Sequence, residues 1–75
     1  MKNLKYVVTR YSQNETLFIF PNWVDHSKFS RHMGVPLSAG FINMKTKICY
    51  GKSLTLKLSS RPEVDTILLK ILLGE

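Results

Sequence analysis

The chain has 75 residues, one cysteine, and 11 lysines and arginines against five aspartates and glutamates, which gives a net charge of +6. A chain of this length buries only ~60% of the surface that its unfolded form exposes, and it predicts a single domain over residues 1–75. One cysteine excludes an intrachain disulfide framework, and no apolar run approaches the ~20 residues of a membrane span. We therefore expect a small cytoplasmic protein.

The first elements predict an antiparallel hairpin. Residues 4–11 and 16–20 are rich in β-branched and aromatic types, as strands are, and residues 12–15 are polar turn formers. Pro21 ends the second strand because it lacks the amide donor that a ladder of strands needs. The short connection makes the two strands neighbours.

An amphipathic helix is predicted next, with Asn22 as its N-cap and Gly34 at its end. At about 100° per residue, one face of this helix is mainly apolar and the other is basic. The inner face comprises Trp23, His26, Phe29, Ser30 and Met33, and the outer face comprises Lys28, Arg31 and His32. On the inner face we expect His26 to be a buried histidine satisfied by a hydrogen bond.

Two more strands are predicted beyond this helix. Residues 38–44 form the third, in which Gly40 marks a bulge or a close approach of two backbones. Residues 45–47 make the turn. The fourth strand covers residues 48–58, with a bend at Gly51, and its second half alternates apolar and polar residues as a sheet with one wet face does.

The last helix has the clearest signals. Ser60 is its predicted N-cap, Pro62 lies in the first turn, and Glu63 completes a capping box, while Gly74 follows the end. The predicted core stripe consists of Val64, Ile67, Leu68 and Ile71. The element order is ββαββα, which predicts an α+β fold: a small four-stranded antiparallel sheet with two helices on one face.

The residues that could carry catalysis or bind a metal do not form a recognised pattern. Gly51-Lys52-Ser53 resembles the end of a phosphate-binding loop, but Thr46 stands where that motif requires a glycine. His26, His32, Cys49, Asp25 and Asp65 show no metal-ligand spacing. Cys49 lies in a predicted strand, which favours a buried, unreactive thiol. We therefore predict no enzyme activity, no metal and no cofactor.

A basic surface is the first candidate for function. The side chains predicted to contact a partner are Lys28, Arg31, Lys45, Lys47 and Lys52, with Lys57 nearby. Tyr6, Tyr11 and Tyr50 could supply stacking faces among them, as in proteins that bind single-stranded nucleic acid. The alternative is that these lysines only protect turns and strand edges from aggregation.

The second candidate is the last helix, because its apolar arc is wider than one sheet face needs. Leu69 and Leu73 lie outside the predicted core stripe. They predict either a homodimer through this helix or an interface for another partner. The alternative is that the chain itself buries them.

Two stretches resemble those of small bacteriophage and prophage proteins of uncharacterised activity. The first is Phe20-Pro21-x-x-Val24-x-His26-x-x-Phe29. The second joins Ser38-Ala39-Gly40-Phe41, Cys49-Tyr50-Gly51-Lys52-Ser53 and Ser60-Arg61-Pro62-Glu63. The resemblance implies a short accessory protein that counters host defence, as anti-CRISPR proteins do, by covering a nucleic-acid path or a protein surface.

The expected function is therefore macromolecular binding in the cytoplasm of a bacterial host cell, with no membrane partner. The resemblance makes the partner a bacterial protein or ribonucleoprotein complex of a defence system such as CRISPR–Cas. The net charge leaves a second hypothesis open, direct binding of nucleic acid or regulation through it. A small structural protein that oligomerises through the last helix is the third.

Overall fold

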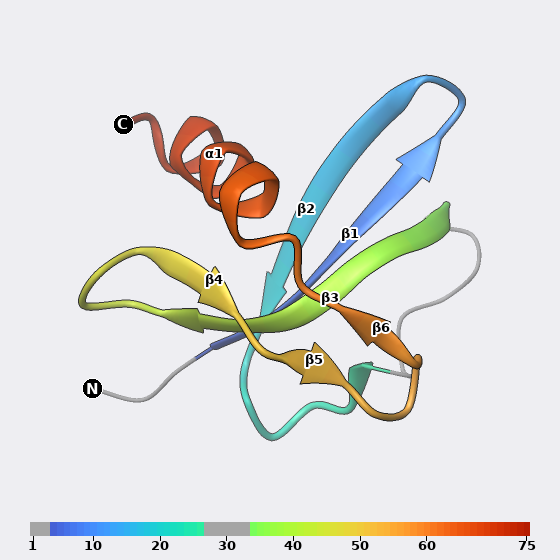
Figure 1. Ribbon diagram of the computed structural model, residues 1–75. Coiled ribbons are helices and arrows are strands. Elements are labelled where there is room, and N and C mark those ends of the chain that lie inside the picture. Colours follow the sequence, from blue (N-terminus) through green and yellow to red (C-terminus); the bar gives the residue numbers. More distant parts are fainter. Residues whose placement is uncertain (1–3, 27–33) are drawn as a thin grey trace.

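A computed structural model describes residues 4–26 and 34–75, and Figure 1 shows the arrangement of its strands and its helix. Four strands form an antiparallel sheet in the order β2-β1-β3-β4. Their bounds are Leu4–Tyr11 for β1, Asn14–Phe20 for β2, Val35–Asn43 for β3 and Ile48–Tyr50 for β4. The predicted four-stranded antiparallel sheet and the α+β class are confirmed.

The two hairpins of this sheet close through turns at the predicted places. Strands β1 and β2 pair from Lys5 opposite Phe20 to Tyr11 opposite Asn14, and the turn places Ser12 at a φ of 61°. Between β3 and β4, the side-chain oxygen of Asn43 accepts the amide hydrogens of Lys45 and Thr46 at 2.9 and 3.2 Å. A side chain that bonds to its own turn in this way favours the turn over a longer strand.

The predicted fourth strand over residues 48–58 is wrong beyond residue 50. The chain bends at Gly51, as predicted, and then forms a separate two-stranded ribbon of β5 (Lys52–Ser53) and β6 (Leu58–Ser59). The Ser53 hydroxyl accepts the amide hydrogen of Leu56 at 3.2 Å, which stabilises a turn over residues 54–57. The alternation of apolar and polar residues therefore does not extend one strand here.

The described part of the chain contains one helix, α1 (Pro62–Leu73), so the described residues do not match the expected order ββαββα with two helices. Where the first helix was predicted to begin, the chain turns, with the Val24 amide donating to the Pro21 carbonyl at 3.1 Å. Trp23, predicted on a buried face, is 80% exposed. The rest of that prediction, including Lys28 and Arg31, lies outside the described residues.

Helix α1 begins and ends where predicted but is capped differently at its start. Pro62 occupies the first turn and Gly74 ends the helix in the left-handed conformation, with a φ of 79°. The N-cap is Arg61 rather than Ser60, and no side chain of a capping box bonds there. Instead the carboxylate of Asp65 accepts the Arg61 amide hydrogen at 2.8 Å. No helix of the described residues is long and apolar enough to span a membrane.

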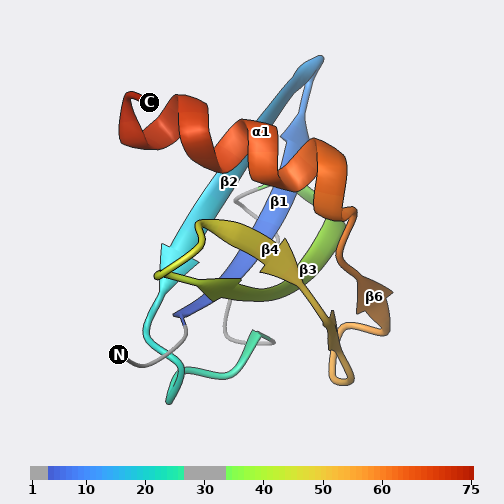
Figure 2. The same ribbon diagram turned by 60° about the vertical axis from the view of Figure 1, so that its left-hand side comes forward.

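Both faces of the sheet are covered. On one face α1 packs over β2 and β4 (Figure 2), and the core there is built from alternate residues of β1 with residues of the other elements. This cluster comprises Tyr6, Val8, Leu17, Ile42, Cys49 and Leu69. The opposite face carries a smaller cluster of Val7, Phe20 and Ala39, against which Val24, Leu56 and Leu58 pack. The second face is therefore covered by the β5–β6 ribbon and by residues that follow β2.

The face of α1 that turns toward the sheet differs from the predicted one. Leu69 and Asp65 are buried, whereas Val64, Ile67 and Ile71 of the predicted core stripe are exposed. The reason lies in Asp65, whose carboxylate accepts a hydrogen bond from the buried hydroxyl of Tyr6. Leu69 is four residues beyond Asp65 and so lies on the same face of the helix. Leu69 is thereby fixed inside.

Candidate partner-binding groove

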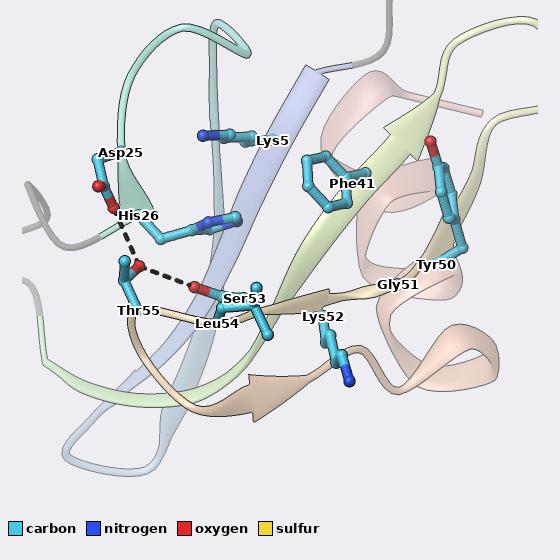
Figure 3. Close-up of a pocket in the computed structure, with 10 residues that line it drawn as sticks. All are labelled: Lys5, Asp25, His26, Phe41, Tyr50, Gly51, Lys52, Ser53, Leu54 and Thr55. Atoms are coloured by element: carbon cyan, nitrogen blue, oxygen red, sulfur yellow. Dashed lines mark hydrogen bonds between the residues drawn. The ribbon is translucent and has the colours of Figure 1, made fainter.

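A groove of about 460 Å³ opens on the sheet face opposite α1, where β1 and β3 meet the chain that leads from β4 into β5. Figure 3 shows its side chains. They are Lys5, Asp25, His26, Phe41, Tyr50, Gly51, Lys52, Ser53, Leu54 and Thr55. They come from four separate stretches of the sequence, so only the fold brings them together.

His26 is a buried part of the groove, held by one hydrogen bond and two ring contacts. Its Nε2 donates to the Gly40 carbonyl at 3.0 Å, and its ring centroid lies 5.5 and 5.8 Å from those of Phe20 and Phe41 in T-shaped contacts. Burial lowers the pKa of His26 below its usual value and so favours the neutral ring. The predicted role of His26 as a buried, hydrogen-bonded histidine is confirmed.

The backbone beside His26 is packed too tightly for a side chain. A Cβ added to Gly40 would lie 2.3 Å from the carbonyl oxygen of Tyr50. The predicted close approach of two backbones at Gly40 is therefore confirmed. This contact fixes β4, and with it the Tyr50 side chain, against β3.

Two aromatic rings form one wall of the groove. Phe41 and Tyr50 are cross-strand partners, and their ring centroids lie 5.9 Å apart with an angle of 34° between the planes. Tyr50 is 38% exposed, so part of its ring faces solvent. Gly51 follows at a φ of 81°, and an added Cβ would lie 3.0 Å from the Phe41 ring. This glycine lets the chain pass directly over Phe41.

The opposite wall is held by a chain of hydrogen bonds (Figure 3). The Thr55 hydroxyl donates to the Asp25 carboxylate at 3.0 Å and lies 3.2 Å from the Ser53 hydroxyl. These bonds tie the β5–β6 turn to the segment that follows β2. They place one carboxylate at this end of the groove.

Two lysines carry the positive charge of the groove. Lys5 of β1 lies opposite both Phe20 and Phe41 in the sheet register, and Lys52 begins β5. In Figure 3 the Phe41 ring lies between Lys5 and Tyr50. Across residues 4–26 and 34–75 the ion pairs are formed by Arg61, with Glu15 and Asp65, and neither groove lysine takes part. Both ammonium groups are therefore available to an acidic ligand.

The predicted contact lysines do not all share this place. Lys52 lines the groove, whereas Lys45 and Lys47 lie in the β3–β4 turn beyond the other end of β4. Lys47 and Lys52 are five positions apart, or at most roughly 17 Å at the rise of an extended strand. Lys47 also donates to the Met44 carbonyl at 3.0 Å and so helps to close its own turn.

The three tyrosines proposed as stacking faces have different positions. Tyr50 lines the groove, and Tyr11 is exposed at the far end of the β1–β2 hairpin. Tyr6 is fully buried, and its hydroxyl donates to Asp65 at 2.5 Å. Burial, together with this bond, raises the pKa of Tyr6. Tyr6 therefore stabilises the fold and has no exposed surface for a ligand.

The cysteine and the leucines of the last helix that the sequence singled out lie on the α1 side of the sheet. Cys49 is buried there as predicted, and burial raises the pKa of its thiol to about 11. Within the described residues no three histidine, cysteine, aspartate or glutamate side chains gather as a metal site requires. Leu69 has no exposed surface, and Leu73 retains a partly exposed side chain at the end of α1.

Sequence reasoning missed Lys5 and Phe41 as groove residues. Both lie in predicted strands. The alternation of side chains assigns each residue to one of the two faces of its own strand, but it does not say which residues of two strands lie side by side on the same face of the sheet. The register that puts Lys5 beside Phe41 follows only once β1 is known to lie between β2 and β3. Tyr50 and Lys52 were accessible from sequence because they flank the predicted bend at Gly51.

No protein-family model, curated protein or solved structure matches this chain.

Proposed function

We propose that the protein acts by binding an acidic macromolecule in the groove formed by Lys5, Phe41, Tyr50 and Lys52. The observation that carries this proposal is the position of two lysines, free of ion pairs with the described residues, beside an exposed tyrosine. Tyrosine is enriched at interfaces because it combines a rigid apolar ring with a polar hydroxyl. The net charge of +6 favours approach of an acidic partner.

The partner that we propose is a bacterial protein or ribonucleoprotein complex of a defence system such as CRISPR–Cas. This assignment depends on the resemblance to short bacteriophage proteins; of the stretches that carry it, Phe41 and residues 50–53 line the groove. In this proposal the protein works in the cytoplasm of the bacterial host and blocks the surface that it covers. The lysines donate charge, and Tyr50 anchors the contact.

The surroundings of His26 and Cys49, the candidates for a catalytic base and a nucleophile, favour binding over catalysis. The Nε2 of His26 is occupied by the Gly40 carbonyl, and the Cys49 thiol is buried on the other side of the sheet. A catalytic base must reach the proton that it removes, and a nucleophilic thiol must become a thiolate. The buried Cys49 thiol does not meet the second condition, and a His26 residue that is only 4% exposed has little surface with which to reach a substrate.

The test is affinity capture from a bacterial lysate, with and without nuclease, using the wild-type protein, Lys52→Glu and Lys57→Glu. Lys57 is a matched control, since it is exposed on the same β5–β6 ribbon and does not line the groove. We expect a protein complex that survives nuclease, is reduced at least about tenfold by Lys52→Glu and is retained by Lys57→Glu. Equal retention by both variants contradicts the groove as the binding site.

The defence hypothesis has its own readout. Expression of the wild-type protein in a strain immunised by CRISPR–Cas is expected to restore plaque formation by the targeted phage, and Lys52→Glu is expected to reduce this effect. Plaque numbers that stay unchanged for the wild-type protein across several defence systems contradict this partner class. They leave the groove itself to be tested by capture.

Direct binding of single-stranded nucleic acid is the second candidate, favoured by the Phe41 and Tyr50 rings beside the lysines. Salt separates the two candidates. Each phosphate contact releases counterions when it forms. The logarithm of the binding constant for a single strand therefore falls linearly with the logarithm of the salt concentration, with a slope of about −0.7 per contact. A capture product that disappears with nuclease, and an affinity for a labelled oligonucleotide that follows this slope, would favour nucleic acid.

A further inference from the structure

The outer face of α1 carries an apolar stripe that no described element covers. Val64, Ile67 and Ile71 are 46, 60 and 68% exposed. Their spacing places them along one line of the helix, on the side away from the buried Asp65 and Leu69. Half-buried Leu68 borders one flank of this stripe.

The other flank is charged in an ordered way. Glu63 and Lys70 are both exposed and lie seven residues apart, which puts them on the same side of the stripe, with the acid near the start of α1 and the base near its end. Neither forms an ion pair with a described residue. Glu63 and Lys70 lie at nearly equal distances on either side of Ile67.

This arrangement is complementary to itself. If a second helix runs antiparallel across a two-fold axis near Ile67, Glu63 meets Lys70 of the partner subunit, and the symmetry generates the same pair again. The same operation brings Val64 opposite Ile71 of the partner subunit and places the two Ile67 regions together. Two-fold interfaces use one patch twice and require such self-complementarity.

We propose that the occupant of this stripe is a second copy of the same chain, bound through an antiparallel α1–α1 contact. A parallel pairing would not bring Glu63 and Lys70 together, because equivalent residues would then lie at the same height. Burial of three large aliphatic side chains from each copy supplies the driving force, and the two ion pairs set the direction.

The size of the contact bounds its strength. Twelve residues of α1 make a helix of ~18 Å, so the pair is at the small end of specific interfaces. The charge of +6 on each copy opposes association, but at physiological salt such repulsion is screened over about 8 Å. We therefore expect a dimer that dissociates in the micromolar range.

The test is sedimentation equilibrium of purified protein over roughly 1 to 500 μM. The wild-type protein is expected to form dimers, and Ile67→Asp is expected to weaken them at least about a hundredfold. Leu54→Asp is the matched control, since Leu54 is 77% exposed but lies on the β5–β6 turn. Circular dichroism verifies that each variant is folded. A monomeric wild-type protein over this range, or equal weakening by both substitutions, overturns the proposal.

Charge exchange tests the antiparallel direction. Glu63→Lys and Lys70→Glu each create two like-charge contacts and are expected to weaken the dimer about tenfold. The double variant Glu63→Lys/Lys70→Glu restores both pairs with reversed signs and is expected to regain most of the wild-type affinity. Additive losses in the double variant overturn the antiparallel pairing. This proposal is independent of the groove, because α1 lies on the other face of the sheet.

Discussion

The two faces of the sheet differ in how their polar groups are used. On the α1 face, the Asp65 carboxylate accepts bonds from the Tyr6 hydroxyl, the Arg61 amide at 2.8 Å and the Arg61 Nε at 3.1 Å. On the groove face, Lys5 and Lys52 form no ion pair with the described residues. Satisfied buried polar groups fix a structure, whereas exposed charges beside an aromatic ring are available for binding. In our proposal, the α1 face stabilises the fold and the groove face binds the partner.

The largest expected effect is the loss of the buried carboxylate on the α1 face. Asp65→Ala leaves the Tyr6 hydroxyl and two Arg61 donors without their acceptor, and we expect a loss of about 3–5 kcal/mol in the free energy of unfolding. Urea denaturation followed by circular dichroism measures this loss.

Glu15→Gln is the control for Asp65→Ala, because it breaks the 2.9 Å pair between Arg61 and Glu15 at side chains that are 34% exposed. We expect it to cost less than about 1 kcal/mol. If the two substitutions cost the same, the network does not hold α1 in its observed orientation.

A smaller effect is expected at the contact that positions the groove. Gly40→Ala forces the backbone of β4 away from β3, because the added Cβ would lie 2.3 Å from the Tyr50 carbonyl oxygen. We expect a loss of about 2 kcal/mol in thermal or urea unfolding and weaker partner binding. Gly74→Ala has open space around its Cβ but a φ of 79°, so it is expected to cost about 1 kcal/mol and to leave binding unchanged.

The smallest effect concerns pH. Burial lowers the pKa of His26, whereas the unfolded chain keeps a pKa of about 6.5. As the pH falls below about 6.5 the unfolded state takes up a proton first, so the stability present at neutral pH declines. The free energy of unfolding falls by at most about 1.4 kcal/mol per pH unit, and it stops falling once the pH is below the pKa of His26 in the folded state.

Urea unfolding between pH 5 and pH 7 tests this assignment. His26→Gln removes the titrating group and is expected to flatten the profile. The same slope in the wild-type protein and in His26→Gln would show that another group titrates.

The elements that the sequence predicted correctly are those set by local chemistry. The turn after β1, the Asn43 turn and the start and end of α1 follow from polar turn formers, Pro62 and Gly74. The strand predicted over residues 48–58 failed because a local bond from Leu56 to Ser53 competes with pairing.

The orientation of α1 could not be read from periodicity. The helix is apolar over most of its circumference, and the usual rule places a charged residue such as Asp65 outside. That rule fails because Tyr6, 59 positions earlier in the chain, supplies a buried hydroxyl to the carboxylate. Leu69 then packs inside, and Ile67 and Ile71 face outward. A partner 59 residues away leaves no periodic signal.

The most direct test of the account compares the two surfaces in one pull-down, with Lys52→Glu for the groove and Ile67→Asp for the outer face of α1. If the groove binds the macromolecular partner, Ile67→Asp retains the partner as a monomeric bait, and Lys52→Glu loses it while remaining dimeric. The opposite result, in which Lys52→Glu retains the partner and Ile67→Asp loses it, would assign recognition to α1 and contradict the division between the two faces.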